Sequence, residues 1–101
     1  MIRLLCALLL LGAPAQAADR IVSLNLCTDE MLVLLAPARI AALSPLARDP
    51  SISVVAEQAL RLPWVRPVAE AVLARDPDLI LAGPYGAQTV LPLLEARGVT
   101  V

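Results

Sequence analysis

The feature that most constrains this chain is a change from helix to strand within residues 70–83. A helical apolar pattern stops at Arg75-Asp76-Pro77-Asp78, and the short apolar run Leu79-Ile80-Leu81-Ala82-Gly83 follows it. Proline disfavours the helical conformation in the residue before it, and the apolar run is too short for a helix of ordinary length. The segment therefore predicts a helix, a stop, a buried strand and a glycine-containing loop.

Continuous apolar strands are typical of parallel sheets that helices cover on both faces. Similar short runs stand at residues 21–24 and 40–43, residues 99–101 predict the start of a fourth strand, and helices are expected over residues 29–35, 52–60, 67–75 and 89–97. This alternation predicts right-handed crossovers in an α/β fold, a Rossmann-like parallel sheet with flanking helices. Ligands of such sheets lie just beyond the carboxyl ends of the strands, which here include residues 83–86.

The first helix is expected to follow the polar corner at residues 25–28. Either Cys27 or Thr28 is predicted to cap it, because side-chain acceptors at this point satisfy free backbone N–H groups. Asp29 and Glu30 would favour the positive end of its dipole, and residues 31–35 would supply its buried side.

Prolines and a glycine mark the ends of the other helices. Pro37 is expected to end the first helix, and Pro67 is predicted in the first turn of the helix that reaches Arg75, where its missing N–H is not needed. Pro92 is tolerable only in the first turn of the last helix, and Gly98 is a natural stop after it.

The beginning of the chain predicts export. A short basic start precedes the apolar residues 4–11, and Ala15-Gln16-Ala17 is an Ala-x-Ala cleavage signal. This pattern is typical of a secretory signal peptide at residues 1–17, and the apolar run is shorter than the roughly 20 residues that span a bilayer. We expect a periplasmic protein whose residues 18–101 form one small domain; the competing interpretation is an uncleaved membrane anchor.

Composition excludes several classes of function. The chain has eight basic residues against nine acidic ones and no histidine. A mildly acidic chain without a basic block is a poor partner for nucleic acid, and the commonest general base and metal ligand is missing. No glycine-rich phosphate loop follows any predicted strand. We therefore expect a protein that is not an enzyme and has no cofactor and no metal site.

Only Cys27 remains after removal of the signal peptide, so no internal disulfide is expected. A thiol at a helix start can become reactive, but Asp29 and Glu30 oppose a thiolate there. An unreactive thiol that lines a loop is favoured over a redox role. The acidic pairs Asp29-Glu30 and Asp76-Asp78 are interpreted as helix-terminus features.

The two aromatic residues of the chain, Trp64 and Tyr85, are both expected in loops. Aromatic side chains at strand ends suit flat ligands, but covering an exposed apolar edge is an equally good interpretation. Arg48 and Arg66, in neighbouring loops, could bind an anionic ligand or could simply be solvated.

Taken together, several motifs give the chain a recognisable order. It resembles the N-terminal part of the periplasmic substrate-binding proteins of ABC importers for iron complexes, haem and cobalamin. The resemblance covers residues 20–101 and rests on Arg20-Ile21-Val22-Ser23-Leu24, Asn25-Leu26-Cys27-Thr28-Asp29-Glu30, Trp64 with Glu70, Asp76-Pro77-Asp78-Leu79-Ile80-Leu81-Ala82-Gly83, and Leu94-Glu95-Ala96-Arg97-Gly98-Val99-Thr100-Val101.

The resemblance implies a two-lobed binder with its ligand held between the lobes, of which residues 18–101 would form a truncated N-terminal lobe. Trp64 is similar to the cleft tryptophan of the cobalamin-binding members, and the family's cleft loops would correspond to Asn25, Cys27, Ser44 and Tyr85. Glu70 resembles the glutamate that docks on the permease in the inner membrane. The linking helix and the second lobe are not in this sequence.

The leading hypothesis is a solute-binding component of an ABC importer that captures a ferric siderophore or haem, as a monomer, and delivers it to the permease. A cobalamin-binding member of the same family is the second hypothesis, although Arg66 stands where cobalamin binders tend to have glycine. A third is a small exported interaction domain without a transported ligand, with Trp64 and Tyr85 at its contact. A redox protein that uses Cys27 is the fourth.

Overall fold

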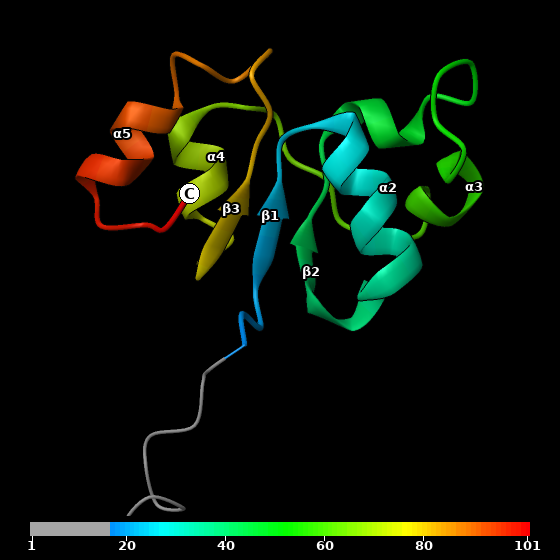
Figure 1. The fold of residues 1–101 in the computed structure, drawn as a ribbon, viewed down its shortest axis with the longest axis horizontal. Coiled ribbons are helices and arrows are strands. Elements are labelled where there is room, and N and C mark those ends of the chain that lie inside the picture. Colours follow the sequence, from blue (N-terminus) through cyan, green and yellow to red (C-terminus); the bar gives the residue numbers. More distant parts are fainter. Residues whose placement is uncertain (1–16) are drawn as a thin grey trace, which may run out of the picture.

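Three short strands form the centre of the protein. The computed structural model describes residues 17–101, so the expected signal peptide lies outside the described residues except for Ala17 and stays a prediction. Strands β1 (Ile21–Ser23), β2 (Ile40–Ala42) and β3 (Leu79–Leu81) make a parallel sheet in the order β2-β1-β3 (Figure 1). This confirms the α/β class and the three strands expected near these positions.

Helices connect the strands. They are α2 (Leu26–Leu35), α3 (Ala56–Ala59), α4 (Ala69–Leu73) and α5 (Leu91–Ala96), with two short 3₁₀ helices, η1 (Pro37–Arg39) and η2 (Pro45–Arg48). The connection through α2 leads from β1 to one neighbour, and the connection through α4 crosses β1 to reach the other. Because such crossovers are right-handed, α2 and α4 lie on opposite faces of the sheet.

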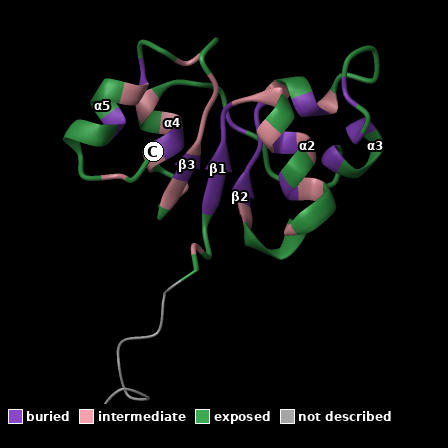
Figure 2. Cartoon of the chain, viewed as in Figure 1, coloured by how far each residue is buried: buried purple, intermediate pink, exposed green. Residues whose placement is uncertain are grey.

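Two buried clusters correspond to the two faces. The larger one joins the strands to α4 and α5 and contains Val22, Leu24, Ala41, Ala42, Val65, Val72, Ile80, Val90 and Leu94. The smaller one, of Leu43, Ala47 and Ala59, packs with Val33, Ile40 and Leu62 near α2 and α3. Strand β1 is buried throughout, β2 is buried at two of its three residues, and β3 is buried at its central residue Ile80 (Figure 2), as expected for a covered parallel sheet.

The turn before β3 is held by the start of β1. The carboxylate of Asp78 accepts hydrogen bonds from the backbone N–H groups of Asp19 (2.9 Å) and Arg20 (3.1 Å), and Arg20 Nε donates to the carbonyl of Asp76 at 2.9 Å. Asp76 itself has a φ of 51°, the left-handed conformation that ends α4. The polar residues around Pro77 therefore have structural partners at both ends of the turn.

Two expectations about helix ends are confirmed. Pro92 lies in the first turn of α5, where its missing N–H leaves no hydrogen bond unmade. Gly98 follows the helix with a φ of 81°, a conformation that glycine adopts without steric cost.

The prediction for α2 was wrong in two respects. The helix begins at Leu26 and not after Thr28, because Asn25 is extended and its side chain accepts from the N–H groups that open the helix. Its buried residues are Asp29 and Leu32, whereas three of the apolar residues predicted to be buried are exposed, namely Met31, Leu34 and Leu35.

Three other segments are shorter than predicted. The helix expected over residues 52–60 covers only α3, because Ser51 and Ser53 hydrogen-bond locally to Asp49 and to the N–H of Val55 and so compete with a helical turn. Pro67 precedes the cap residue of α4 and is not in its first turn. Residues 99–101 form no strand: the carbonyl of Thr100 accepts from the N–H of Ile80 at 2.8 Å, without a continuing ladder.

Candidate functional site

Three loops meet at the carboxyl edge of the sheet. One follows each strand, and they begin with Leu24 and Asn25 after β1, Leu43 and Ser44 after β2, and the segment from Ala82 to Tyr85 after β3. These loops lie at the pointed ends of the arrows in Figure 1. This edge is where ligands of parallel α/β sheets bind, and it contains most of the candidate site residues.

Asn25 connects the first and third loops. Its Oδ1 accepts hydrogen bonds from the N–H groups of Cys27 (2.9 Å) and Thr28 (3.3 Å), and this caps α2. The amide packs so closely on Gly83 that a Cβ added there would come within 2.3 Å of Asn25 Nδ2. Asn25 therefore has two structural contacts, and any side chain at position 83 would displace its amide.

Ser44 is tied to a buried acid. Its backbone N–H donates to Asp29 Oδ1 at 3.1 Å, and its hydroxyl donates to the other carboxylate oxygen. Both residues are buried. Burial raises the pKa of Asp29 above its ordinary value of 3.8, the nearby charge of Glu30 adds to this, and the bonds from Ser23 and Ser44 oppose it.

A small cavity opens at this edge. It has a volume of about 260 Å³, and its walls are mainly apolar, made by Leu24, Ser44, Pro45, Leu46, Pro67, Gly86 and Ala87. Every one of the three loops contributes to it. Ser44 is the one predicted site residue among these walls, and Tyr85 is the immediate neighbour of the wall residue Gly86.

Trp64 lies beside the end of β2. Its segment forms a parallel bridge with Leu43, in which the N–H of Val65 donates to the carbonyl of Leu43 at 2.8 Å. Trp64 is 36% exposed, and the guanidinium carbon of Arg48 lies over its indole, 5.2 Å from the ring centroid. Trp64 is therefore fixed through its backbone while its side chain faces outward.

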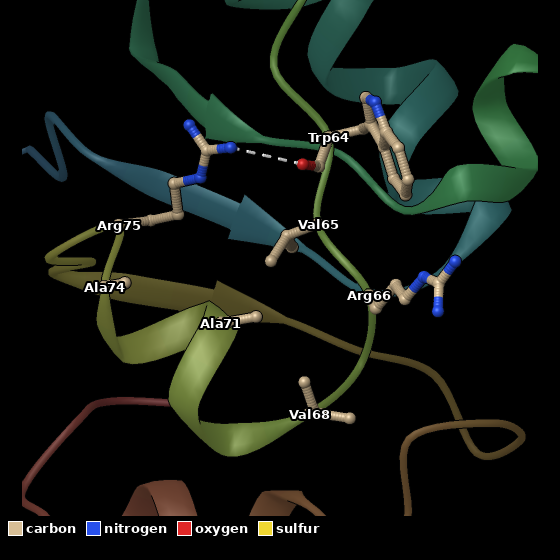
Figure 3. Close-up of a pocket in the computed structure, with 7 residues that line it drawn as sticks. All are labelled: Trp64, Val65, Arg66, Val68, Ala71, Ala74 and Arg75. Carbon is tan, nitrogen blue, oxygen red and sulfur yellow. Dashed lines mark hydrogen bonds between the residues drawn. The ribbon is translucent and has the colours of Figure 1, made fainter.

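A larger groove of about 500 Å³ runs between this segment and α4 (Figure 3). Its lining residues are Trp64, Val65, Arg66, Val68, Ala71, Ala74 and Arg75. Arg75 crosses the groove and donates from Nη2 to the carbonyl of Trp64 at 3.3 Å. The cavity at the sheet edge and this groove are neighbours, because Pro67 lines one and Arg66 and Val68 line the other.

The remaining candidates are at the surface. Tyr85 is 83% exposed, and Cys27 is an exposed free thiol in the first turn of α2. Glu70 is exposed in the first turn of α4, on the same side of the sheet as α5. The structure thus places Asn25, Ser44, Trp64 and Tyr85 at the sheet edge. The side chains of Tyr85, Cys27 and Glu70 are exposed.

Sequence reasoning missed the roles of Asp29 and Gly83. Asp29 was interpreted as complementing the helix dipole, whereas the structure buries it against Ser44, fifteen positions away. A contact over that separation leaves no local signal. The position of Gly83 directly after an apolar run was the available sign of a close approach.

Comparisons of the chain with protein-family models, with curated proteins and with solved structures find no match. No helix in residues 17–101 combines the length and the apolar character needed to cross a membrane. Within the same residues, no three side chains of histidine, cysteine, aspartate or glutamate are grouped so that they could hold a metal ion.

Proposed function

We propose that this protein is the exported solute-binding component of an ABC importer, that residues 18–101 belong to a Rossmann-like N-terminal lobe, and that it captures an iron complex such as a ferric siderophore or haem. The observation that carries the proposal is the location of two exposed aromatic residues at the carboxyl edge of a parallel sheet, Trp64 beside the end of β2 and Tyr85 in the loop after β3, an edge that also holds an apolar cavity. Aromatic faces and apolar walls suit a bulky, partly planar ligand. The order of motifs over residues 20–101 supports the same conclusion.

In this proposal the ligand rests on the edge of the sheet. Trp64 and Tyr85 cover its flat faces, and the three loops set its position. Asn25 packs on Gly83 of the third loop, and Ser44 holds the second loop to α2 through Asp29. Cys27 lies at the rim. Glu70 stays exposed for a salt bridge to an arginine of the permease.

Ligand capture is tested with the fluorescence of Trp64, the sole tryptophan of the chain. Haem, ferric siderophores and cobalamin are titrated separately, and we expect an iron complex to quench the emission with saturation. Tyr85→Ala should weaken the binding, whereas Leu60→Ala, a change at another exposed apolar side chain, should not. Absence of saturable quenching by any of these compounds would contradict the proposal, and quenching by cobalamin alone would select a cobalamin-binding function.

Docking on the permease is tested by reversing the charge of Glu70. Glu57 provides a matched control, because both glutamates are exposed in the first turn of a short helix. Glu70→Arg should reduce ligand-stimulated ATP hydrolysis by the reconstituted importer without changing ligand affinity, and Glu57→Arg should change neither. Equal effects of the two variants would exclude a specific role for Glu70.

An interaction domain without a transported ligand is the second candidate. It is favoured by the exposed apolar residues of α2, Met31, Leu34 and Leu35, since contiguous exposed apolar side chains often mark a protein contact. If no small molecule binds and Leu34→Glu abolishes binding of a protein partner, this function replaces the first. A thiol-dependent redox function would require that Cys27 alkylate faster than free cysteine at neutral pH.

A further inference from the structure

Arg48 and Trp64 form a cation–π pair at the carboxyl edge of the sheet. Arg48 ends η2, Trp64 lies beside β2, and the guanidinium carbon is 5.2 Å from the centre of the indole ring. A guanidinium over a tryptophan face is attracted by the ring, so both side chains are held in place. The Nε of Arg48 is buried and has no hydrogen-bond partner among the described residues. Within residues 17–101, that donor of the guanidinium group is therefore not used by the protein.

Arg66 adds a second cation on the same side. It is two residues after Trp64 in an extended segment, so the two side chains point the same way, and Figure 3 shows the indole and the Arg66 guanidinium on one side of the chain. Arg66 is exposed. Arg75 differs from both, because it points to the opposite side and donates to the carbonyl of Trp64.

Both cations lie on the indole side of the segment that carries Trp64. Arg48 stacks on the ring, and Arg66 belongs with Trp64 to the lining of the larger groove, whereas neither arginine lines the cavity at the sheet edge. A molecule seated beside Trp64 would thus meet an indole ring and two guanidinium groups.

We infer that the site selects a ligand that carries a carboxylate on a flat ring system, with the carboxylate between Arg48 and Arg66 and the ring against Trp64. Guanidinium groups match a carboxylate through two parallel N–H donors, and such charge-assisted bonds are stronger than neutral ones. The inference rests on the proposed function, because it names the chemical class of the molecule bound at the same site. It extends that function by making the acid, in addition to the flat shape, a requirement for binding.

The test uses two probes of nearly the same shape, naphthalene-2-carboxylate and naphthalene-2-carboxamide, and the full chain labelled with ¹⁵N. The sole tryptophan gives a single indole N–H signal in a heteronuclear NMR spectrum, which reports binding at Trp64 directly. We expect the carboxylate to bind at least about fivefold more tightly than the amide and to lose this advantage at high salt.

Variants identify the residues responsible. Arg66→Gln and Arg48→Gln should each remove most of the preference for the carboxylate, and Arg97→Gln, a change at an exposed arginine after α5, should leave it intact. Because Arg66 is exposed, its variant is expected to fold, so the test does not depend on Arg48→Gln. Thermal unfolding of each variant verifies the fold.

The inference is overturned if the two probes bind equally, if neither binds, or if Arg97→Gln has the same effect as Arg66→Gln. Its failure can be separated from failure of the proposed function. An iron complex that binds with the same affinity before and after Arg66→Gln would support capture and reject the acid requirement. If the carboxylate probe is preferred but no iron complex binds, the acid requirement is supported and capture of an iron complex is rejected.

Discussion

At the scale of single residues, Asn25 and Gly83 show how one contact joins helix capping to loop packing. The side chain of Asn25 accepts hydrogen bonds from the N–H groups of Cys27 and Thr28, and it also fills the space beside Gly83. A methyl group at position 83 would need the room that the Asn25 amide occupies. The cap of α2 and the loop after β3 are therefore coupled.

This coupling predicts a non-additive pair of substitutions. Gly83→Ala should lower the free energy of unfolding by about 1 kcal/mol, the usual cost of losing an N-cap, because the added Cβ displaces Asn25. Asn25→Ala should cost a similar amount. In the Asn25→Ala background Gly83→Ala should cost much less, and chemical denaturation of the four proteins of this cycle measures the difference. Additive losses would show that the two side chains are independent.

Because Asp29 is buried, we expect the free energy of unfolding to depend on pH. Burial raises the pKa of Asp29 above its ordinary 3.8, so the folded protein holds this proton more tightly than the unfolded chain does. Its stabilising contribution is complete below about pH 3.8 and is lost as the pH rises through the folded pKa. Asp29→Asn should therefore reduce the loss of stability between about pH 4 and pH 7, as measured by urea unfolding at each pH.

Asp49 supplies a control of opposite sign. Hydrogen bonds from Ser51 lower the pKa of this exposed carboxyl, so its contribution is present above the ordinary value of 3.8 and is lost as the pH falls through the folded pKa. Asp49→Asn should change the free energy of unfolding only at the acidic end of its pH dependence. If Asp29→Asn and Asp49→Asn change the pH dependence of unfolding in the same direction, the pKa of Asp29 is not raised by burial.

At the scale of elements, α2 is held to the sheet by a narrow stripe. Leu32 is 7% exposed, whereas Leu34 and Leu35 are 66% and 77% exposed. The sequence of this helix is apolar nearly all round, so periodicity does not identify its buried side. The side of α2 that faces the protein interior is fixed by the buried hydrogen bonds from Ser44 to Asp29.

The leucines of α2 are therefore expected to differ in their importance. Leu32→Ala should lower the free energy of unfolding by about 2–5 kcal/mol, since it removes buried methyl groups and leaves a cavity. Leu34→Ala and Leu35→Ala should each stay within about 0.5 kcal/mol. Thermal and urea unfolding of the three variants give the comparison. A large loss at Leu35 would mean that this face is covered in solution.

At the scale of the whole molecule, ligand capture should stabilise the fold. A ligand that binds only the folded chain raises the free energy of unfolding by about 2.7 kcal/mol at a concentration one hundred times its dissociation constant. We expect this shift with the iron complex that quenches Trp64 and not with a compound that fails to quench it. Differential scanning calorimetry at several ligand concentrations measures the shift. Quenching without stabilisation would indicate binding that does not depend on the fold.

The sequence by itself determined the elements whose signals are local. The apolar run between Pro77 and Gly83 predicted β3, and Gly98 predicted the end of α5, because proline and glycine restrict or free the backbone wherever they occur. The position of a loop after each strand followed from the same pattern. Hence the α/β class and the edge with the candidate site could be read from the chain.

Only the tertiary structure decided which side chains those elements bring together. The bond of Asp29 to Ser44 and the contact of Asn25 with Gly83 join residues distant in sequence, as does the stacking of Arg48 on Trp64. Local propensity likewise does not specify the neighbours that bury Asp29 and leave Leu35 exposed. The same is true of residues 99–101, which form no strand. The physical reason is that packing and desolvation act between elements, and their energies outweigh the preferences of a single segment.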